Sequence, residues 1–336
     1  MTLDEVRSRV ARGVGAARDL VPRRYRRPSE QKGPHVTRPP QPPRRMPVSA
    51  PPLELSSAEK LARAALSIVA ALMVGFLLSI SLVSHLQHAV SQQQLGDEFR
   101  QLLRDGTAPV SEGNADGVLL ADGSPVAYLE IPILGVHEFV VEGTNSGSLR
   151  AGPGHRRDTV LPGQEGTSVI MGRAAAYGGP FSRLQELQPG QHFSMVTGQG
   201  QFTYEVIGVR YAGDPSPPAP VAGESRLVLE TARGVPYVPE GVVRVDASLT
   251  STTQPAGLRQ TTSISLPASH WELASDNSTV WALVFALQLL VVIEIAAVWS
   301  LRRIGPRKTW VVFVPLTLLG GLLVADQVSR LLPNLL

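Results

Sequence analysis

Cysteine is absent from all 336 residues of the chain. This absence excludes disulfide bonds, cysteine-ligated zinc and a thiol nucleophile. Histidine is sparse, and the seven histidines follow neither HxxxH nor HxH spacing, at positions 35, 85, 88, 137, 155, 192 and 270. Since a GxSxG elbow and a phosphate-binding loop are also missing, the sequence predicts no metal site and no cofactor.

Lysine and net charge are low as well. Of 31 basic residues only Lys32, Lys60 and Lys308 are lysines, and the formal net charge is +3. The arginines gather in the N-terminal tail and beside apolar runs, and they form no single stripe along one segment. This distribution predicts no nucleic-acid partner.

Three long apolar runs predict three transmembrane helices. The runs lie at residues 61–86, 279–301 and 309–328. The first has no charged residue between Arg63 and His85 and is long enough to cross roughly 30 Å of hydrocarbon. A cleaved signal peptide is the rival interpretation of this run, but the run begins far from the N-terminus and exceeds the usual apolar core of such a peptide.

Basic residues beside the runs predict their orientation. The loop 302–308, RRIGPRK, and the arginine-rich tail 1–60 both belong in the cytoplasm, because basic segments stay on that side. Three crossings then leave four segments outside the cell. These are a stalk, a folded domain, a linker and the C-terminal segment, at residues 87–119, 120–252, 253–278 and 329–336.

The tail 1–60 is rich in proline and arginine and has little that could form a core, so we expect it to be disordered. Its arginines favour contact with anionic membrane lipids, and RPPQPP is typical of a docking site for a cytoplasmic partner. A linker without either task is equally consistent with this composition.

Glu294 interrupts the second apolar run. A carboxylate within a bilayer is costly unless it is paired or reaches water. One interpretation has it reach toward Arg302 or Arg303, near the cytoplasmic end. The other is a contact with a partner transmembrane helix.

Residues 120–252 consist of short alternating apolar segments separated by glycine and proline, which is typical of a small β-barrel or sandwich. For example, alternation from Gln201 to Val206 places Phe202, Tyr204 and Val206 on one face. About 130 residues can bury an adequate core without disulfides. The residues alone therefore indicate a membrane-tethered β-domain.

Five short motifs give a more specific signal. They are VAYLEIPILGV at 126–136, EGTNSGSLRAGPGH at 142–155, PGQEGTSVIMGR at 162–173, YGGPFSRLQELQPGQ at 177–191 and LVLETARG at 227–234. With these five motifs in this order, the chain resembles a sortase. The resemblance is greatest to the class E sortases of actinobacteria. The resemblance implies an eight-stranded β-barrel on the outer face of the plasma membrane of a Gram-positive bacterium. It also implies an activity, transpeptidation of sorting peptides through a cysteine thiolate.

The three positions at which the family carries its catalytic residues hold other residues here. Arg173 stands at the histidine position and Ala232 at the cysteine position, and Val242 stands at the arginine position, two residues before Arg244. Neither Thr231 nor Ser168 has an obvious base that would make it a replacement nucleophile. We expect three arginines to line the groove that the sortase resemblance implies, namely Arg173, Arg233 and Arg244. An equally good interpretation is that they are solvated surface residues.

The missing sulfur leads to an expectation about function. We expect a pseudoenzyme that is not catalytic and acts in binding or assembly at the cell surface, with a protein or peptide ligand in the groove. The alternative is a sortase-family transpeptidase or hydrolase with different chemistry, acting in the anchoring of cell-wall proteins.

Overall fold

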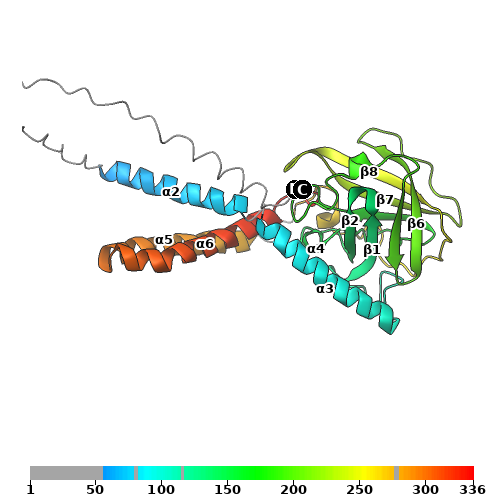
Figure 1. Cartoon of the computed structure of the whole chain (residues 1–336), viewed down its shortest axis with the longest axis horizontal. Helices are drawn as coiled ribbons and strands as arrows, with labels where there is room; N and C mark the ends of the chain where they lie inside the picture. Colours follow the sequence, from blue (N-terminus) through cyan, green and yellow to red (C-terminus); the bar gives the residue numbers. More distant parts are fainter. Residues whose placement is uncertain (1–55, 79–81, 115–116, 276–279) are drawn as a thin grey trace, which may run out of the picture. The chain divides into compact units, whose positions relative to one another are not determined.

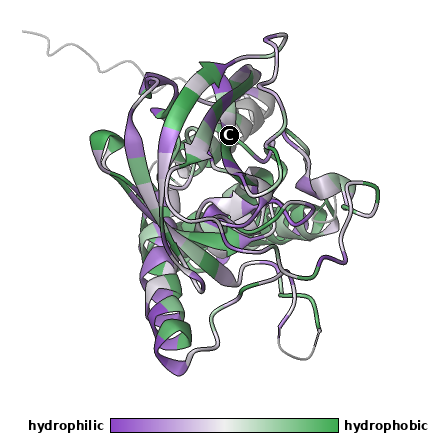
Figure 2. Ribbon diagram, turned by 90° about the vertical axis from the view of Figure 1, so that its right-hand side faces the viewer, coloured by the Kyte–Doolittle hydropathy of each residue, from purple (hydrophilic) through white to green (hydrophobic). Residues whose placement is uncertain are grey.

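The protein is described by a computed structural model that covers residues 56–78, 82–114, 117–275 and 280–336. The basic tail lies almost wholly outside the described residues, so its expected disorder stays a prediction. Figure 1 and Figure 2 show the strands grouped in one body.

Eight strands close into a barrel in the order β1-β2-β3-β4-β7-β8-β6-β5, which confirms the expected eight-stranded fold. The strands are β1 (Pro125–Ile131), β2 (Val136–Glu142), β3 (Gly154–His155), β4 (Gly166–Met171), β5 (His192–Thr197), β6 (Gly200–Arg210), β7 (Ser225–Val235) and β8 (Val238–Leu249). Most neighbours are antiparallel, whereas β2 runs parallel to β3, and β4 runs parallel to β7. This pair brings the end of β4 beside the middle of β7.

Side-chain alternation along the strands produces two separate apolar clusters. Phe202, Tyr204 and Val206 of β6 point into the barrel and belong to its main core, as their spacing predicts. A second cluster lies on the outer face of β4, β7 and β8. It contains Ala232 and Val242, so apolar packing surrounds the positions that the sequence singles out.

One tight loop carries a glycine that its geometry requires. Gly163 has φ +88°, and a Cβ there would lie 2.4 Å from the ring of Phe202. Its backbone N–H donates to the buried hydroxyl of Tyr204 at 2.6 Å. Burial raises the pKa of Tyr204 to about 12, so the phenol stays protonated and holds the loop against the core.

The segment expected as a stalk contains α3 (Ser84–Asp105), and this helix packs on the outside of the barrel. Leu95 and Phe99 are buried, and the Phe99 ring meets Phe139 of β2 edge-on. Gln92 accepts a hydrogen bond from the Phe139 N–H at 2.6 Å and donates to the Ala151 carbonyl at 2.8 Å.

Two helices among the described residues are long and apolar enough to cross a membrane. They are α5 (Val280–Arg303) and α6, of which Arg307–Arg330 is the qualifying part; α6 as a whole is Pro306–Arg330 and continues through Pro315. They lie side by side in Figure 1. The expectation of three such helices is therefore met for two only. The first expected span is helical, as α2 (Ser57–Leu78), but it is not among the two.

Glu294 lies on α5 and lines a small cavity together with residues of α2 and α6, among them Gly75, Thr317 and Gly321. Among the described residues it forms no ion pair with Arg302 or Arg303, which one interpretation of the sequence predicts as its partners. A contact with a helix of another protein stays a prediction.

Candidate functional site

The three residues that the sequence places at the family's catalytic positions come from β7, β8 and the loop after β4. Ala232 on β7 pairs with Val242 on β8, and Arg173 follows the end of β4, two residues after Met171. Ala232 and Val242 are each 8% exposed and share the second apolar cluster with Met171. The sequence alignment therefore selects residues that the fold brings to one face.

Arg173 is fully buried and is no solvated surface residue. Its Nε donates to the Leu149 carbonyl at 3.2 Å and its Nη1 donates to the main-chain oxygen of Leu336 at 2.8 Å. Nη2 donates to the carbonyl and the hydroxyl of Ser146, at 3.1 and 3.0 Å. The guanidinium also lies over the Tyr177 ring, 5.1 Å from its centre. Burial lowers the pKa of Arg173 to about 10, so the side chain stays charged at neutral pH.

Arg233 and Arg244, the other two arginines expected in the groove, have different surroundings. Arg233 is exposed and stacks over the Tyr211 ring at 4.9 Å. Arg244 is held by two carboxylates, with Nε 2.7 Å from Glu230 and Nη2 2.6 Å from Glu272. Burial opposes the charge of Arg244, but these carboxylates outweigh it and raise the pKa of the group. Arg244 is thus engaged within the chain.

Glu230 is the buried member of this group, with 3% of its surface exposed. Burial raises its pKa to about 7, and the negative charge of Glu272 adds to the shift, although Arg244 opposes it. Its Oε2 has no hydrogen-bond partner among the described residues. The carboxyl therefore keeps its proton to a higher pH than an unperturbed glutamate does.

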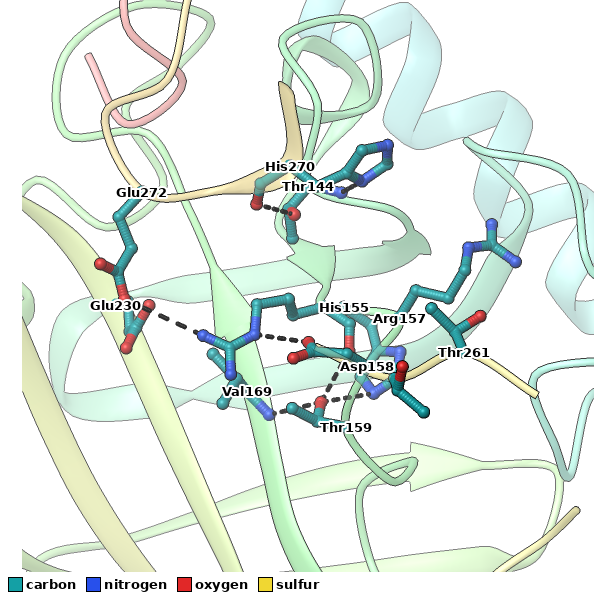
Figure 3. A network of polar contacts seen from close by, with 12 residues as sticks. Thr144, His155, Arg157, Asp158, Thr159, Val169, Glu230, Thr261, His270 and Glu272 are labelled. Atoms are coloured by element: carbon teal, nitrogen blue, oxygen red, sulfur yellow. Dashed lines mark hydrogen bonds and ion pairs between the residues drawn. The ribbon is translucent and has the colours of Figure 1, made fainter. Parts of the chain in front are cut away.

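A polar network extends from Glu272 under the neighbouring loops (Figure 3). Thr144 donates its hydroxyl to the His270 carbonyl at 2.6 Å and its N–H to the ring at 3.1 Å. The fully buried His155 contacts Glu142 through Nδ1 at 2.9 Å and the Val160 carbonyl through Nε2 at 2.8 Å. The network fixes the segment before α5 to the barrel. No local pattern in the sequence predicts these contacts, because the partners lie far apart along the chain.

A pocket of about 230 Å³ opens beside Ala232. Its walls come from the β7–β8 hairpin and from the loop after β4, with Thr231, Arg233, Tyr237, Gln185 and Leu336 among the lining residues. The Thr231 hydroxyl donates to the Gly172 carbonyl at 2.9 Å. Ser168, the other hydroxyl considered from sequence, has none of its surface exposed, so the pocket does not reach it.

The segment after α6 covers the remaining part of this face. Leu335 and Leu336 pack into the second apolar cluster with Ala232 and Val242. The N–H of Ala174 donates to the Leu335 carbonyl at 2.9 Å. The sequence suggested only an outer terminal segment at 329–336 and carried no signal for this docking.

Comparison with known proteins identifies the barrel. A family model of the sortase domain matches residues 129–245. Sortase D of Bacillus subtilis (strain 168) is 33% identical over 85 residues, which are 25% of this chain and 41% of that relative. Residues 129–245 therefore match a sortase domain, and the chain spans less than half of the length of this relative.

Solved sortases are similar at a lower level. A sortase D5 transpeptidase of Clostridium perfringens is 19% identical, with 49% of this chain and 99% of that chain covered and a TM-score of 0.39. Sortase E of Streptomyces avermitilis is 28% identical, with 40% and 93% covered and a TM-score of 0.34. Clostridium perfringens sortase C, solved with the C-terminal cell wall sorting motif, is 18% identical, with 48% and 88% covered and a TM-score of 0.37.

The expectation that the chain is not an enzyme is wrong. The match of residues 129–245 to the sortase domain is the finding that overturns it. No feature of the described residues is a positive sign of lost activity. The absence of cysteine excludes a thiolate mechanism and excludes nothing more.

Proposed function

We propose that this sortase domain binds short peptide segments of cell-surface polypeptides at the outer face of β4, β7 and β8. The domain faces the outside of a Gram-positive plasma membrane, to which the apolar helices anchor it. The observation that carries this proposal is a set of donors that recognise main chain beside an apolar pocket. Arg173 and the N–H of Ala174 both donate to peptide oxygens there.

The chemistry of this face suits a peptide better than an ionic ligand. The buried guanidinium of Arg173 is satisfied by carbonyl and hydroxyl oxygens, and the pocket lining includes no acidic residue or histidine, with Arg233 as its one cation. In such a site, hydrogen bonds to the main chain of the peptide supply affinity, and apolar pockets select among its side chains.

Filling the pocket tests this proposal. Gln185 is exposed on the pocket wall, whereas Gln188 is exposed on the same loop but does not line the pocket. The full-length chain in detergent is immobilised and offered a pool of octapeptides with two fixed adjacent leucines. We expect Gln185→Trp to lower retention of the best-bound peptides about tenfold or more, a loss of about 1.4 kcal/mol.

Gln188→Trp is the matched control and should leave retention unchanged. Equal retention by the two variants would remove the pocket from the binding site. Retention of no peptide by the folded chain would refute the proposal itself. The eluted peptides are also read by mass spectrometry, since cleavage products lost in Gln185→Trp would place turnover at the same pocket, with a nucleophile other than sulfur.

A further inference from the structure

Six residues after α6, 331–336, lie against the proposed binding face as a bound peptide would. Asn334 and Leu335 have none of their surface exposed, and Leu336 is 3% exposed. In Figure 1 the mark C, at the last residue of this segment, lies beside the barrel.

The main chain of the segment is bound at three places. Ala174 donates to the Leu335 carbonyl and Arg173 to the Leu336 oxygen, while the N–H of Asn334 donates to the Ala274 carbonyl at 2.9 Å. The Leu336 N–H donates to the Pro333 carbonyl at 3.1 Å, so the bound segment is a tight turn.

Its side chains are recognised as well. The carboxamide of Asn334 donates to the carbonyls of Ser269 at 2.6 Å and Trp271 at 3.1 Å. Leu335 and Leu336 enter the apolar cluster that holds Ala232 and Val242. A carboxamide followed by two leucine-sized side chains therefore defines what this face accepts.

The last turns of α6 tie the segment to the same loops. Asp326 accepts a hydrogen bond from Arg150 at 2.9 Å, and the Ser329 hydroxyl lies 2.8 Å from that of Tyr177. Arg150 belongs to the short helix α4 (Ser148–Ala151) and Tyr177 to the loop after β4. These two segments also hold Arg173, through Leu149 and through the Tyr177 ring. A shift of this candidate membrane helix would therefore pull on the bound turn.

We propose that residues 331–336 are a tethered ligand of the groove. Their Asn-Leu-Leu turn covers the groove until a peptide with the same features displaces the segment. This inference rests on the proposed function, because it names the class of peptide that the groove selects. It also makes α6 the element that delivers or withdraws the cover.

The absence of cysteine makes the test direct. Ala232→Cys creates a single thiol under the segment, and the exposed Ala212→Cys provides a reference. The rate of maleimide labelling is measured for the full-length chain in detergent. We expect slow labelling at position 232, and an increase of about tenfold or more when Leu335→Asp places a charge in the apolar cluster. Labelling at position 212 should not change.

Two further variants guard against a general loss of fold. Leu335→Met keeps the apolar contact and should keep position 232 protected. Asn334→Ala removes only the carboxamide bonds and should raise the labelling rate in the same direction as Leu335→Asp. Melting followed by circular dichroism checks that the barrel remains folded in each variant.

A peptide of sequence KKLLPNLL, added to the Leu335→Asp chain, should restore protection of position 232, whereas KKLLPNDL should not. Unchanged labelling in a folded Leu335→Asp chain would show that the segment does not cover the groove, and it would leave the peptide-retention experiment untouched. Raised labelling without protection by the peptide would mean that the segment is only a structural cover, which overturns the tethered-ligand inference.

Discussion

Replacement of Arg173 by methionine should lower the free energy of unfolding of the barrel by about 3–5 kcal/mol. The side chain is fully buried, and its guanidinium satisfies oxygens of Leu149, Ser146 and Leu336. Methionine fills much of the volume but donates no hydrogen bond, so these oxygens would be left buried and unsatisfied. Urea unfolding followed by circular dichroism measures the loss.

The control for this prediction is Arg233→Met. Arg233 is exposed and contacts only the face of Tyr211 among the interactions that the structure describes, and such a contact is worth about 1 kcal/mol or less. If the two variants lost similar stability, the guanidinium of Arg173 would not be the bridge between the loops and the segment 331–336. A selective loss in Arg173→Met would identify a structural role for Arg173, which the sequence predicts to stand at the family's histidine position.

The alternation of apolar and polar residues predicted the strands of the barrel, because this pattern depends only on residues close together in the sequence. Alternation along a strand fixes which side chains enter the core, and Phe202, Tyr204 and Val206 do so. The family motifs likewise selected Ala232 and Val242, which the fold places opposite one another. What the sequence could not provide was the state of Arg173. Its environment depends on Leu149, Ser146 and Leu336, and Leu336 is 163 residues away in the chain.

The same limit applies to Arg244, which the sequence predicts as a groove residue. Its position two residues after Val242 gives the correct face of β8, but its partners come from β7 and from the segment before α5. Glu272 has no periodic pattern around it that could have revealed the contact. The position of an arginine along a strand can be predicted from sequence, whereas the carboxylates that pair with it can be identified only from the tertiary structure.

Glu230 should make the stability of the wild-type barrel fall as the pH rises from 5 to 8, by an amount on the order of 3 kcal/mol. Its pKa is about 7 in the folded chain, against 4.5 for the unperturbed group. Between these values the unfolded chain has lost the proton that the folded chain still holds. Unfolding therefore becomes easier as the pH rises through this window, and the decrease levels off above the folded pKa.

Glu230→Gln removes the titration and keeps an oxygen that can accept the hydrogen bond from Arg244. Its stability should stay flatter from pH 5 to 8 than that of the wild type, while Glu240→Gln, a change at an exposed residue of β8, should keep the wild-type slope. Because each variant retains the histidines, the difference between their curves isolates one carboxyl group. Glu272 acts in another pH range, because hydrogen bonds from Arg244 overcome the effect of burial and lower the pKa of Glu272. The lowered pKa of Glu272 stabilises the folded chain above the unfolded pKa, and this stabilisation is lost only in more acidic solution. Parallel curves for the wild type and Glu230→Gln would show that the buried carboxyl is ionised throughout, held so by Arg244.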